Sequence, residues 1–184
     1  MANYFGVPTP GKYQLIYLDP PWQYADTRSE ASTGAALSAY SCMSPREMGD
    51  MLPVIDSIAL PQCSIAMWAT FPKLPEALEL LKAWNFRYCT ALFVWVKRYA
   101  DGTAYAGLGH YTRANAEMVL LGRRGDALPR HDLTVRQIVE SERGRHSAKP
   151  AEVRQRLERL FGPVSRIELF ARERVEGWAN DIDR

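Results

Sequence analysis

Four consecutive residues, Asp19-Pro20-Pro21-Trp22, combine an acid, two prolines and a large aromatic side chain. A carboxylate and a carbonyl can each accept a hydrogen from an amine. The prolines stiffen the turn and have no N–H, so we expect their carbonyl oxygens to be without competing amide hydrogens. The flat face of Trp22 can stack on a ring. This combination suits a planar ligand that carries an NH₂ group; a strand end with a structural tryptophan is the alternative.

The tetrapeptide follows an apolar run, Gln14 to Leu18, that is rich in β-forming residues and predicts a buried strand. Proline cannot donate to a strand ladder, so the chain must leave the sheet after Asp19. In open α/β sheets the ligand crevice lies at the carboxyl ends of the strands. The sequence therefore predicts that Asp19 lies in a ligand crevice.

The rest of the chain alternates between predicted helices and strands. The predicted helices run from a Ser44–Glu47 capping box to about Ile55, over Lys73–Trp84, and from the segment opening at His146 to Phe161. The predicted strands are Ser64–Thr70, Arg87–Lys97, Glu117–Gly122 and Ser165–Arg172. This alternation predicts an α/β fold, a mostly parallel sheet with helices on both faces.

Two long loops follow predicted strands, residues 25–41 and 98–114. A long loop directly after a strand end is often a lid or a binding loop. We interpret residues 25–41 as a lid, and a disordered connection is the alternative.

The composition is that of an ordinary globular protein, with 47% hydrophobic and 24% charged residues among 184. We expect one domain over residues 1–184. No apolar run approaches the roughly 20 residues of a membrane span, and Met1–Lys12 lacks the features of a signal peptide. The three cysteines have no metal-binding spacing, so we expect reduced thiols, a cytoplasmic location and no metal.

Basic residues cluster in the second half of the chain, although the net charge is only +2. The segment Arg123–His146 contains six arginines, and Lys97, Arg98 and Arg113 precede it. Because we expect these loops to leave from the carboxyl ends of strands, we interpret them as a surface that follows nucleic-acid phosphates. Acids are interspersed, so an ordinary solvated face is the alternative.

The tetrapeptide resembles the catalytic motif of the MT-A70 family of adenine-N6 methyltransferases, which use S-adenosylmethionine (SAM). Further resemblances follow in the same order, so that together they extend from Tyr13 to Trp178. They are Tyr40-Ser41-Cys42-Met43-Ser44, a strand ending in Trp95-Val96-Lys97, the strand Glu117–Gly122, His146-Ser147-Ala148-Lys149-Pro150, and Glu168-Leu169-Phe170-Ala171-Arg172 before Gly177-Trp178.

The resemblance implies a single-domain, Rossmann-like methyltransferase fold in a permuted order, with the catalytic strand early and the cofactor strand at Ile167–Phe170. That order explains why no glycine-rich fingerprint opens the sequence. It also implies substrate-side residues: Asp19, Pro20, Pro21 and Trp22 as the catalytic group, and Tyr40 as a wall of the base pocket. From the basic surface described above, we take Lys97, Arg123 and Arg124 as nucleic-acid contacts. An aromatic residue that merely precedes a helix is the alternative for Tyr40.

On the cofactor side, Asp19 can lie beside the sulfonium cation of SAM. Lys149 and Arg172 match positions that can meet the carboxylate and ribose ends of SAM, and Phe170 can pack beside the adenosine. His146 is either a polar contact or the lead-in to a helix. Family members often continue after Gly-Trp with a segment that reaches the ribose. This chain departs from that pattern, so we expect either Asp183 or a group elsewhere to accept a hydrogen from the ribose hydroxyls of SAM.

The resemblance therefore implies methyl transfer from SAM to the N6 amine of adenine in a polynucleotide, without a metal or a covalent intermediate. In a duplex the base must flip out of the stack. We favour DNA over RNA because the chain is small and has no appended recognition domain. The alternatives are an RNA adenine-N6 methyltransferase and a non-catalytic nucleic-acid-binding subunit of the same fold. Retention of the tetrapeptide argues against the second. A monomer and a homodimer both stay open.

Overall fold

A computed structural model describes residues 8–9, 11–23, 42–109, 111–144 and 148–181 of the chain. The sequence predictions for Tyr40, His146, Asp183 and the loop 25–41 fall outside these residues.

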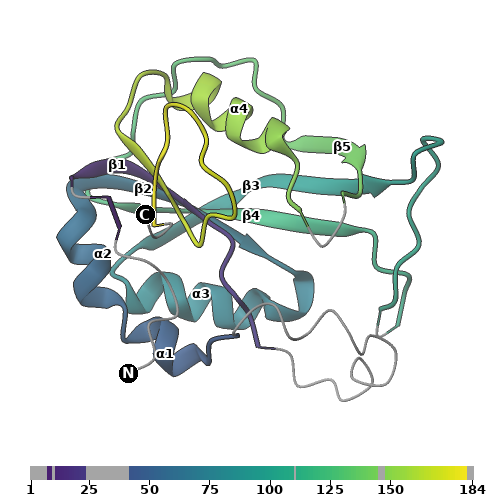
Figure 1. Ribbon diagram of the computed structural model, residues 1–184, viewed down its shortest axis with the longest axis horizontal. Helices are drawn as coiled ribbons and strands as arrows, with labels where there is room; N and C mark the ends of the chain where they lie inside the picture. Colours follow the sequence, from purple (N-terminus) through teal and green to yellow (C-terminus); the bar gives the residue numbers. More distant parts are fainter. Residues whose placement is uncertain (1–7, 10, 24–41, 110, 145–147, 182–184) are drawn as a thin grey trace.

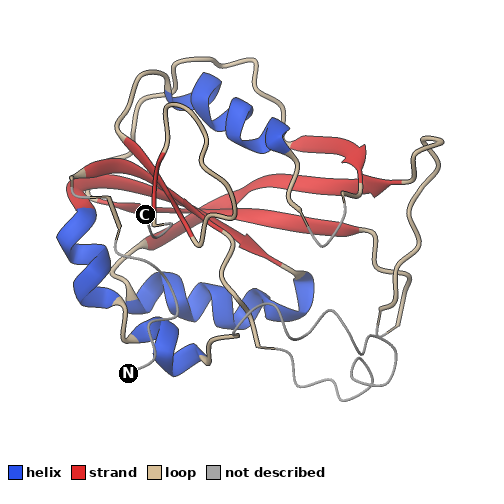
Figure 2. Ribbon diagram, in the orientation of Figure 1, coloured by secondary structure: helices blue, strands red, loops and turns tan. Residues whose placement is uncertain are grey.

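A sheet forms the centre of the described part, with helices on both sides of it (Figure 2). The sheet has seven strands, in the order β5-β3-β4-β2-β1-β6-β7. Its strands are β1 (Tyr13–Leu18), β2 (Ala59–Ala69), β3 (Arg87–Arg98), β4 (Ala116–Arg124), β5 (Ile138–Glu142), β6 (Arg166–Leu169) and β7 (Ala179–Asn180). Four of the six strand pairings are parallel, and the two antiparallel ones both involve β4. The predicted α/β fold with a mostly parallel sheet is confirmed, and β4 runs against the other described strands.

Helices cover both faces of the sheet. One face carries α1 (Pro45–Gly49), α2 (Leu52–Ile58) and α3 (Leu74–Ala83), the last preceded by a 3₁₀ turn, Phe71–Lys73, and the other face carries α4 (Ala151–Phe161) (Figure 1). The predicted capping box is present, with the Glu47 N–H donating to Ser44 Oγ and the Ser44 N–H to Glu47 Oε2. The single helix predicted to about Ile55 is two helices. Pro53 has no N–H with which to continue the ladder of α1.

The central strands direct alternate side chains into two hydrophobic clusters. Ile16 and Leu18 pack on the side of α1, α2 and α3, whereas Leu15 and Tyr17 pack on the side of α4. The same alternation divides β2, where Met67 joins the first cluster and Trp68 the second. This is the period-2 pattern of a strand that is buried on both faces.

Two short strands were absent from the sequence predictions. In β5, Val139 is buried between more exposed neighbours, so no apolar run marks the strand. In β7, two residues pair with Ile167 and Glu168 of β6. The two residues of β7 are too few for hydrophobic periodicity to reveal the strand, and β5 lacks an alternation of apolar and polar residues. None of the helices in the described ranges is both long and apolar enough to cross a lipid bilayer.

Candidate active site

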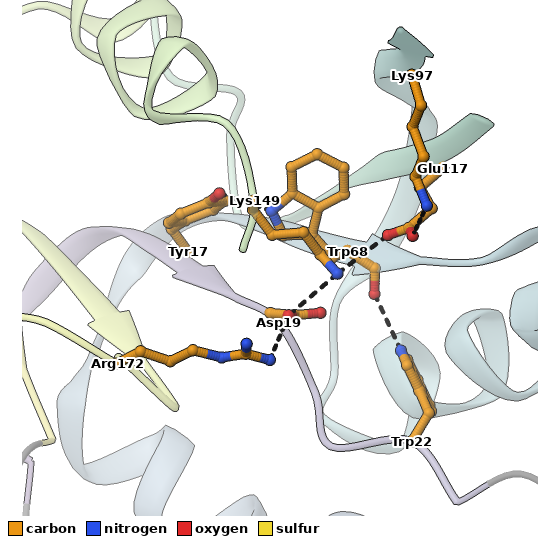
Figure 3. Close-up of polar contacts among 8 residues, drawn as sticks. All are labelled: Tyr17, Asp19, Trp22, Trp68, Lys97, Glu117, Lys149 and Arg172. Atoms are coloured by element: carbon orange, nitrogen blue, oxygen red, sulfur yellow. Dashed lines mark hydrogen bonds and ion pairs between the residues drawn. The ribbon is translucent and has the colours of Figure 1, made fainter. Parts of the chain in front are cut away.

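Asp19 immediately follows β1 and lies between two cations from distant parts of the chain (Figure 3). Its Oδ2 is 3.1 Å from Nζ of Lys149, which precedes α4, and 3.7 Å from a guanidinium nitrogen of Arg172, which follows β6. The structure thus brings together three of the residues that the sequence singled out. They meet at the carboxyl edge of the parallel strands, where a ligand crevice is expected.

A fourth and a fifth charge extend this arrangement. Nζ of Lys149 is also 3.0 Å from Oε2 of Glu117, and Oε1 of Glu117 is 2.5 Å from Nζ of Lys97. We call Lys97, Glu117, Lys149, Asp19 and Arg172 the charge row, because cations and carboxylates alternate along it. The Glu117 side chain is only 11% exposed, and those of both lysines 16%. Charges this deeply buried are tolerated because each has an opposite partner.

The environment gives the two carboxylates different basicities. Burial raises the pKa of Asp19 above its ordinary value, Lys149 and Arg172 act against that rise, and Glu117 adds to it. Burial also acts to raise the pKa of Glu117, but the ammonium groups of Lys149 and Lys97 bring that pKa below its ordinary value. The environment therefore shifts the two pKa values in opposite directions and makes Asp19 a stronger hydrogen-bond acceptor than an unperturbed aspartate.

Burial acts to lower the pKa of Lys149, but Asp19 and Glu117 together raise it above its ordinary value. The Lys149 ammonium therefore stays charged and is held by the two carboxylates. It also lies 5.3 Å from the centre of the Trp68 ring. The structure therefore places Lys149 next to Asp19, and the Lys149 ammonium forms its ion pairs with Asp19 and Glu117.

Trp22 lies in the core and is not a partly exposed plate, and the stacking of its ring on a base stays a prediction. The residue is 7% exposed and belongs to the cluster on the side of α1, α2 and α3. A buried indole N–H needs an acceptor, and that of Trp22 donates to the Trp68 carbonyl oxygen of β2 over 3.2 Å. The Trp68 indole in turn donates to the Tyr17 hydroxyl over 2.6 Å. These contacts give Trp22 a role in fixing the turn after Asp19.

The carbonyl oxygens of Pro20 and Pro21 both accept backbone amide hydrogens, although we expected them from the sequence to be without such partners. The Trp22 N–H donates to the Pro20 oxygen over 2.8 Å, and the Met43 N–H donates to the Pro21 oxygen over 3.0 Å. The competing amides come from neighbouring residues, which the absence of an N–H on proline does not prevent. A carbonyl oxygen has two lone pairs, so Pro20 can still accept a second hydrogen.

Arg123 and Arg124 do not lie at the carboxyl edge where we expected them, because β4 is antiparallel, and their contact with nucleic acid stays a prediction. Their partners, Ser64 and Cys63, lie in the first half of β2, so both arginines lie toward the opposite edge of the sheet from Asp19. Arg124 is 2.8 Å from Asp56 and packs over the Phe86 ring. Arg123 donates to the Gly125 carbonyl oxygen.

The direction of β4 instead places Glu117, near the start of the strand, at the carboxyl edge. Sequence reasoning noted the strand but missed the role of this acid. The signal was present, since Glu117 is a charged residue directly before an apolar run, Met118 to Leu121.

Other basic residues lie at the carboxyl edge. Arg98 ends β3 and forms an ion pair with Glu140, while Arg143 follows β5 and donates its N–H to the Arg98 carbonyl oxygen. The Arg143 guanidinium lies 5.1 Å from the centre of the Tyr105 ring. Arg98 and Arg143 are therefore candidate phosphate contacts at the carboxyl edge. Among the described residues, no group of three or more histidine, cysteine or acidic side chains is arranged to hold a metal ion.

Comparison with known proteins gives a consistent result. A sequence model of the family MT-A70 matches residues 13–180. The chain is 31% identical to the type II methyltransferase M.MunI of a Mycoplasma species, over 92% of this chain and 76% of that protein. It is 28% identical to a putative N(6)-adenosine-methyltransferase MT-A70-like protein of Medicago truncatula, over 88% of this chain but 24% of that protein. For the N(6)-adenosine-methyltransferase MT-A70-like protein of Drosophila melanogaster the identity is 27%, over 88% of this chain and 25% of the relative.

Proposed function

The chain belongs to the MT-A70 family, and on this premise we propose that it transfers a methyl group from SAM to the N6 amine of adenine in DNA. The observation that carries the proposal is the position of Asp19. The acid of the family-like tetrapeptide lies at the carboxyl edge of the sheet, mostly buried and paired with two cations. Adenine-N6 methylation of nucleic acid is the activity that the family and the names of the relatives support.

The choice of DNA rests on how the relatives align. The type II methyltransferase matches this chain over most of the length of both proteins, whereas the N(6)-adenosine-methyltransferase-like proteins match it over about a quarter of theirs. The higher identity and the alignment over most of both proteins favour the type II methyltransferase as the guide to the substrate. We further propose that residues 1–184 form one methyltransferase domain, since the family match covers residues 13–180.

Asp19 and Pro20 hold the substrate amine in this mechanism. Both cations contact Oδ2 of Asp19, and we assign its Oδ1 to one hydrogen of N6. The second lone pair of the Pro20 oxygen accepts the other hydrogen. Because the lone pair of N6 is delocalised into the adenine ring, these two bonds favour a more tetrahedral nitrogen with a directed lone pair. The remaining contribution of the chain is to position the reacting groups.

The residues at the end of β6 fit SAM, which when bound supplies the electrophilic methyl group. The Arg172 side chain is 42% exposed and can pair with a ligand carboxylate. Phe170 is partly buried at the same strand end and offers its ring to an adenosine. The Asp19 carboxylate suits a nearby sulfonium cation. Lys149 influences the bound sulfonium through Asp19, because the Lys149 ammonium lies between the carboxylates of Asp19 and Glu117.

The proposal is tested by incubating the full chain with methyl-labelled SAM and separate pools of duplex DNA, single-stranded DNA and RNA. We expect labelled N6-methyldeoxyadenosine after nucleoside analysis, and none from Asp19→Asn. Asp132→Asn is a matched control, since Asp132 accepts a backbone N–H in a turn at the other end of α4. Label in RNA alone would move the substrate to RNA. Nucleic-acid binding without any methylation would favour the non-catalytic subunit.

A further inference from the structure

The C-terminal strand β7 ends next to a buried acid, Asp181, to which the sequence drew no attention. Asp181 is only 3% exposed. Its Oδ2 accepts the N–H of Phe170 over 2.6 Å, and its Oδ1 accepts the N–H of Ala171 over 3.1 Å. Both carboxylate oxygens are thus bound to the backbone of the turn that follows β6.

That turn has an unusual backbone. Phe170 has a φ of 56°, in the left-handed region that bulky residues rarely adopt. Such a conformation persists where the surroundings determine it, often at a functional site. Asp181 binds the amide of Phe170 itself and the amide that follows. Its carboxylate therefore holds the two peptide groups that define the turn.

The next residue along the chain is Arg172, which contacts Asp19 across 3.7 Å. Asp181 is itself held in place by β7. Ala179 and Asn180 pair with Ile167 and Glu168 of β6, and both the N–H and the hydroxyl of Thr9 donate to the Asn180 carbonyl oxygen. A continuous series of contacts therefore links β7, through the turn that follows β6, to the charge row.

We propose that Asp181 is a positioning residue for the methyl-transfer site. Its carboxylate holds the β6 turn so that the Arg172 guanidinium faces Asp19 and the SAM site. The inference rests on the proposed function for its consequence in catalysis. The structural arrangement itself can be tested without SAM, because Arg172 acts to lower the pKa of Asp19.

The first experiment is a carboxyl ¹³C NMR titration of Asp19 in Arg172→Ala, in Asp181→Asn and in the double variant. Asp181→Asn keeps one acceptor oxygen, so the fold is retained while one of the two backbone bonds is lost. We expect the pKa of Asp19 to rise in both single variants. In the double variant it should rise no further than in Arg172→Ala, because Asp181 acts through Arg172. Equal shifts from Asp181→Asn with and without Arg172 would overturn the proposal, as would no shift at all.

The second experiment measures SAM binding by calorimetry in the same variants and in Asp181→Ala, with Asp132→Ala as the matched control. Loss of one charge-assisted contact corresponds to a roughly tenfold increase in the Kd of SAM. We expect that increase in Asp181→Ala and a smaller one in Asp181→Asn, with an unchanged Kd for DNA. If Asp181→Ala does not fold, Asp181→Asn carries the test. An unchanged Kd for SAM in folded Asp181→Asn would overturn the catalytic part of the inference. Wild-type protein that binds SAM without methylating nucleic acid would instead overturn the proposed function.

Discussion

Replacing Glu117 by glutamine tests whether the charge row is a coupled unit. The substitution keeps the shape of the side chain and one acceptor oxygen but removes the negative charge between two ammonium groups, at 2.5 and 3.0 Å. Removing one partner from a buried ion pair costs about 3–5 kcal/mol. Because the glutamine oxygen can still accept one hydrogen, we expect a loss of roughly 3 kcal/mol in the free energy of unfolding at pH 7. Urea unfolding followed by circular dichroism measures it.

The pH dependence of this loss is a stricter test. The pKa of Glu117 is below its ordinary value of 4.5 in the folded protein. A carboxyl of this kind stabilises the fold above its unfolded pKa, and that stabilisation disappears as the pH falls through the folded pKa. The difference between wild type and Glu117→Gln should therefore be constant from about pH 6 to 8 and should shrink below about pH 4.5. At low pH the protonated wild-type acid and the neutral amide become nearly equivalent.

Glu76→Gln is the matched control, because Glu76 pairs with Lys73 on the surface of α3. The pKa of Glu76 is also lowered, mainly by its hydrogen bond from Lys73, yet a surface pair contributes only about 0–1 kcal/mol. A loss for Glu117→Gln as small as that of the control would refute the coupled row. So would a large loss that does not change between pH 7 and pH 3, since a packing defect is not sensitive to protonation.

Three further predictions follow from the site. Trp22→Ala should cost about 3–5 kcal/mol of unfolding free energy, as for a core tryptophan, and an unchanged stability with weakened binding of an adenine oligonucleotide would restore the stacking role. Lys149→Met should raise the pKa of Asp19, so any remaining methyl transfer should shift to higher pH, and an unshifted pH–rate profile would contradict the pairing. Arg143→Ala should reduce the slope of log affinity for DNA against log salt concentration by roughly 0.7–0.9, whereas Arg123→Ala should leave that slope unchanged. A reduced slope for Arg123→Ala and an unchanged slope for Arg143→Ala would instead place the DNA at the opposite edge of the sheet.

The position of Asp19 could be predicted because it depends on local chemistry. Two prolines end any strand ladder, and a strand end in an α/β sheet faces the ligand crevice. Lys149 and Arg172 were predicted only through the resemblance to a family. Each is an ordinary-looking cation beside a predicted helix or strand, and nothing in its neighbours shows which acid it will meet. That information lies in the packing of α4 and β6 around β1.

The burial of Trp22 and the position of the two arginines at the end of β4 could not be predicted from the sequence, for a physical reason. The burial of an aromatic side chain depends on what packs over it, and here the Trp68 carbonyl and the cluster on the side of α1–α3 provide the partners. The direction of a strand is likewise absent from its hydrophobic pattern, because parallel and antiparallel strands share a period of two. A long loop between β3 and β4 is compatible with either direction.

The reversal of β4 has a chemical consequence for the site. If β4 were parallel, its end with Arg123 would lie near Asp19 and Glu117 would lie at the far edge of the sheet. Lys149 would then have Asp19 as its single acidic partner within the row, while Arg172 would contact Asp19 as it does in the structure. The loss of Glu117 from this edge would lower the basicity of Asp19.

With Glu117 in place, the charge of Lys149 is shared between two acids, and the field of Glu117 itself raises the pKa of Asp19. A more basic carboxylate forms a stronger hydrogen bond to an amine hydrogen. The direction of one strand therefore sets how strongly the proposed catalytic acid can hold its substrate, and Glu117→Gln should weaken that hold while leaving every residue of the Asp-Pro-Pro-Trp motif unchanged.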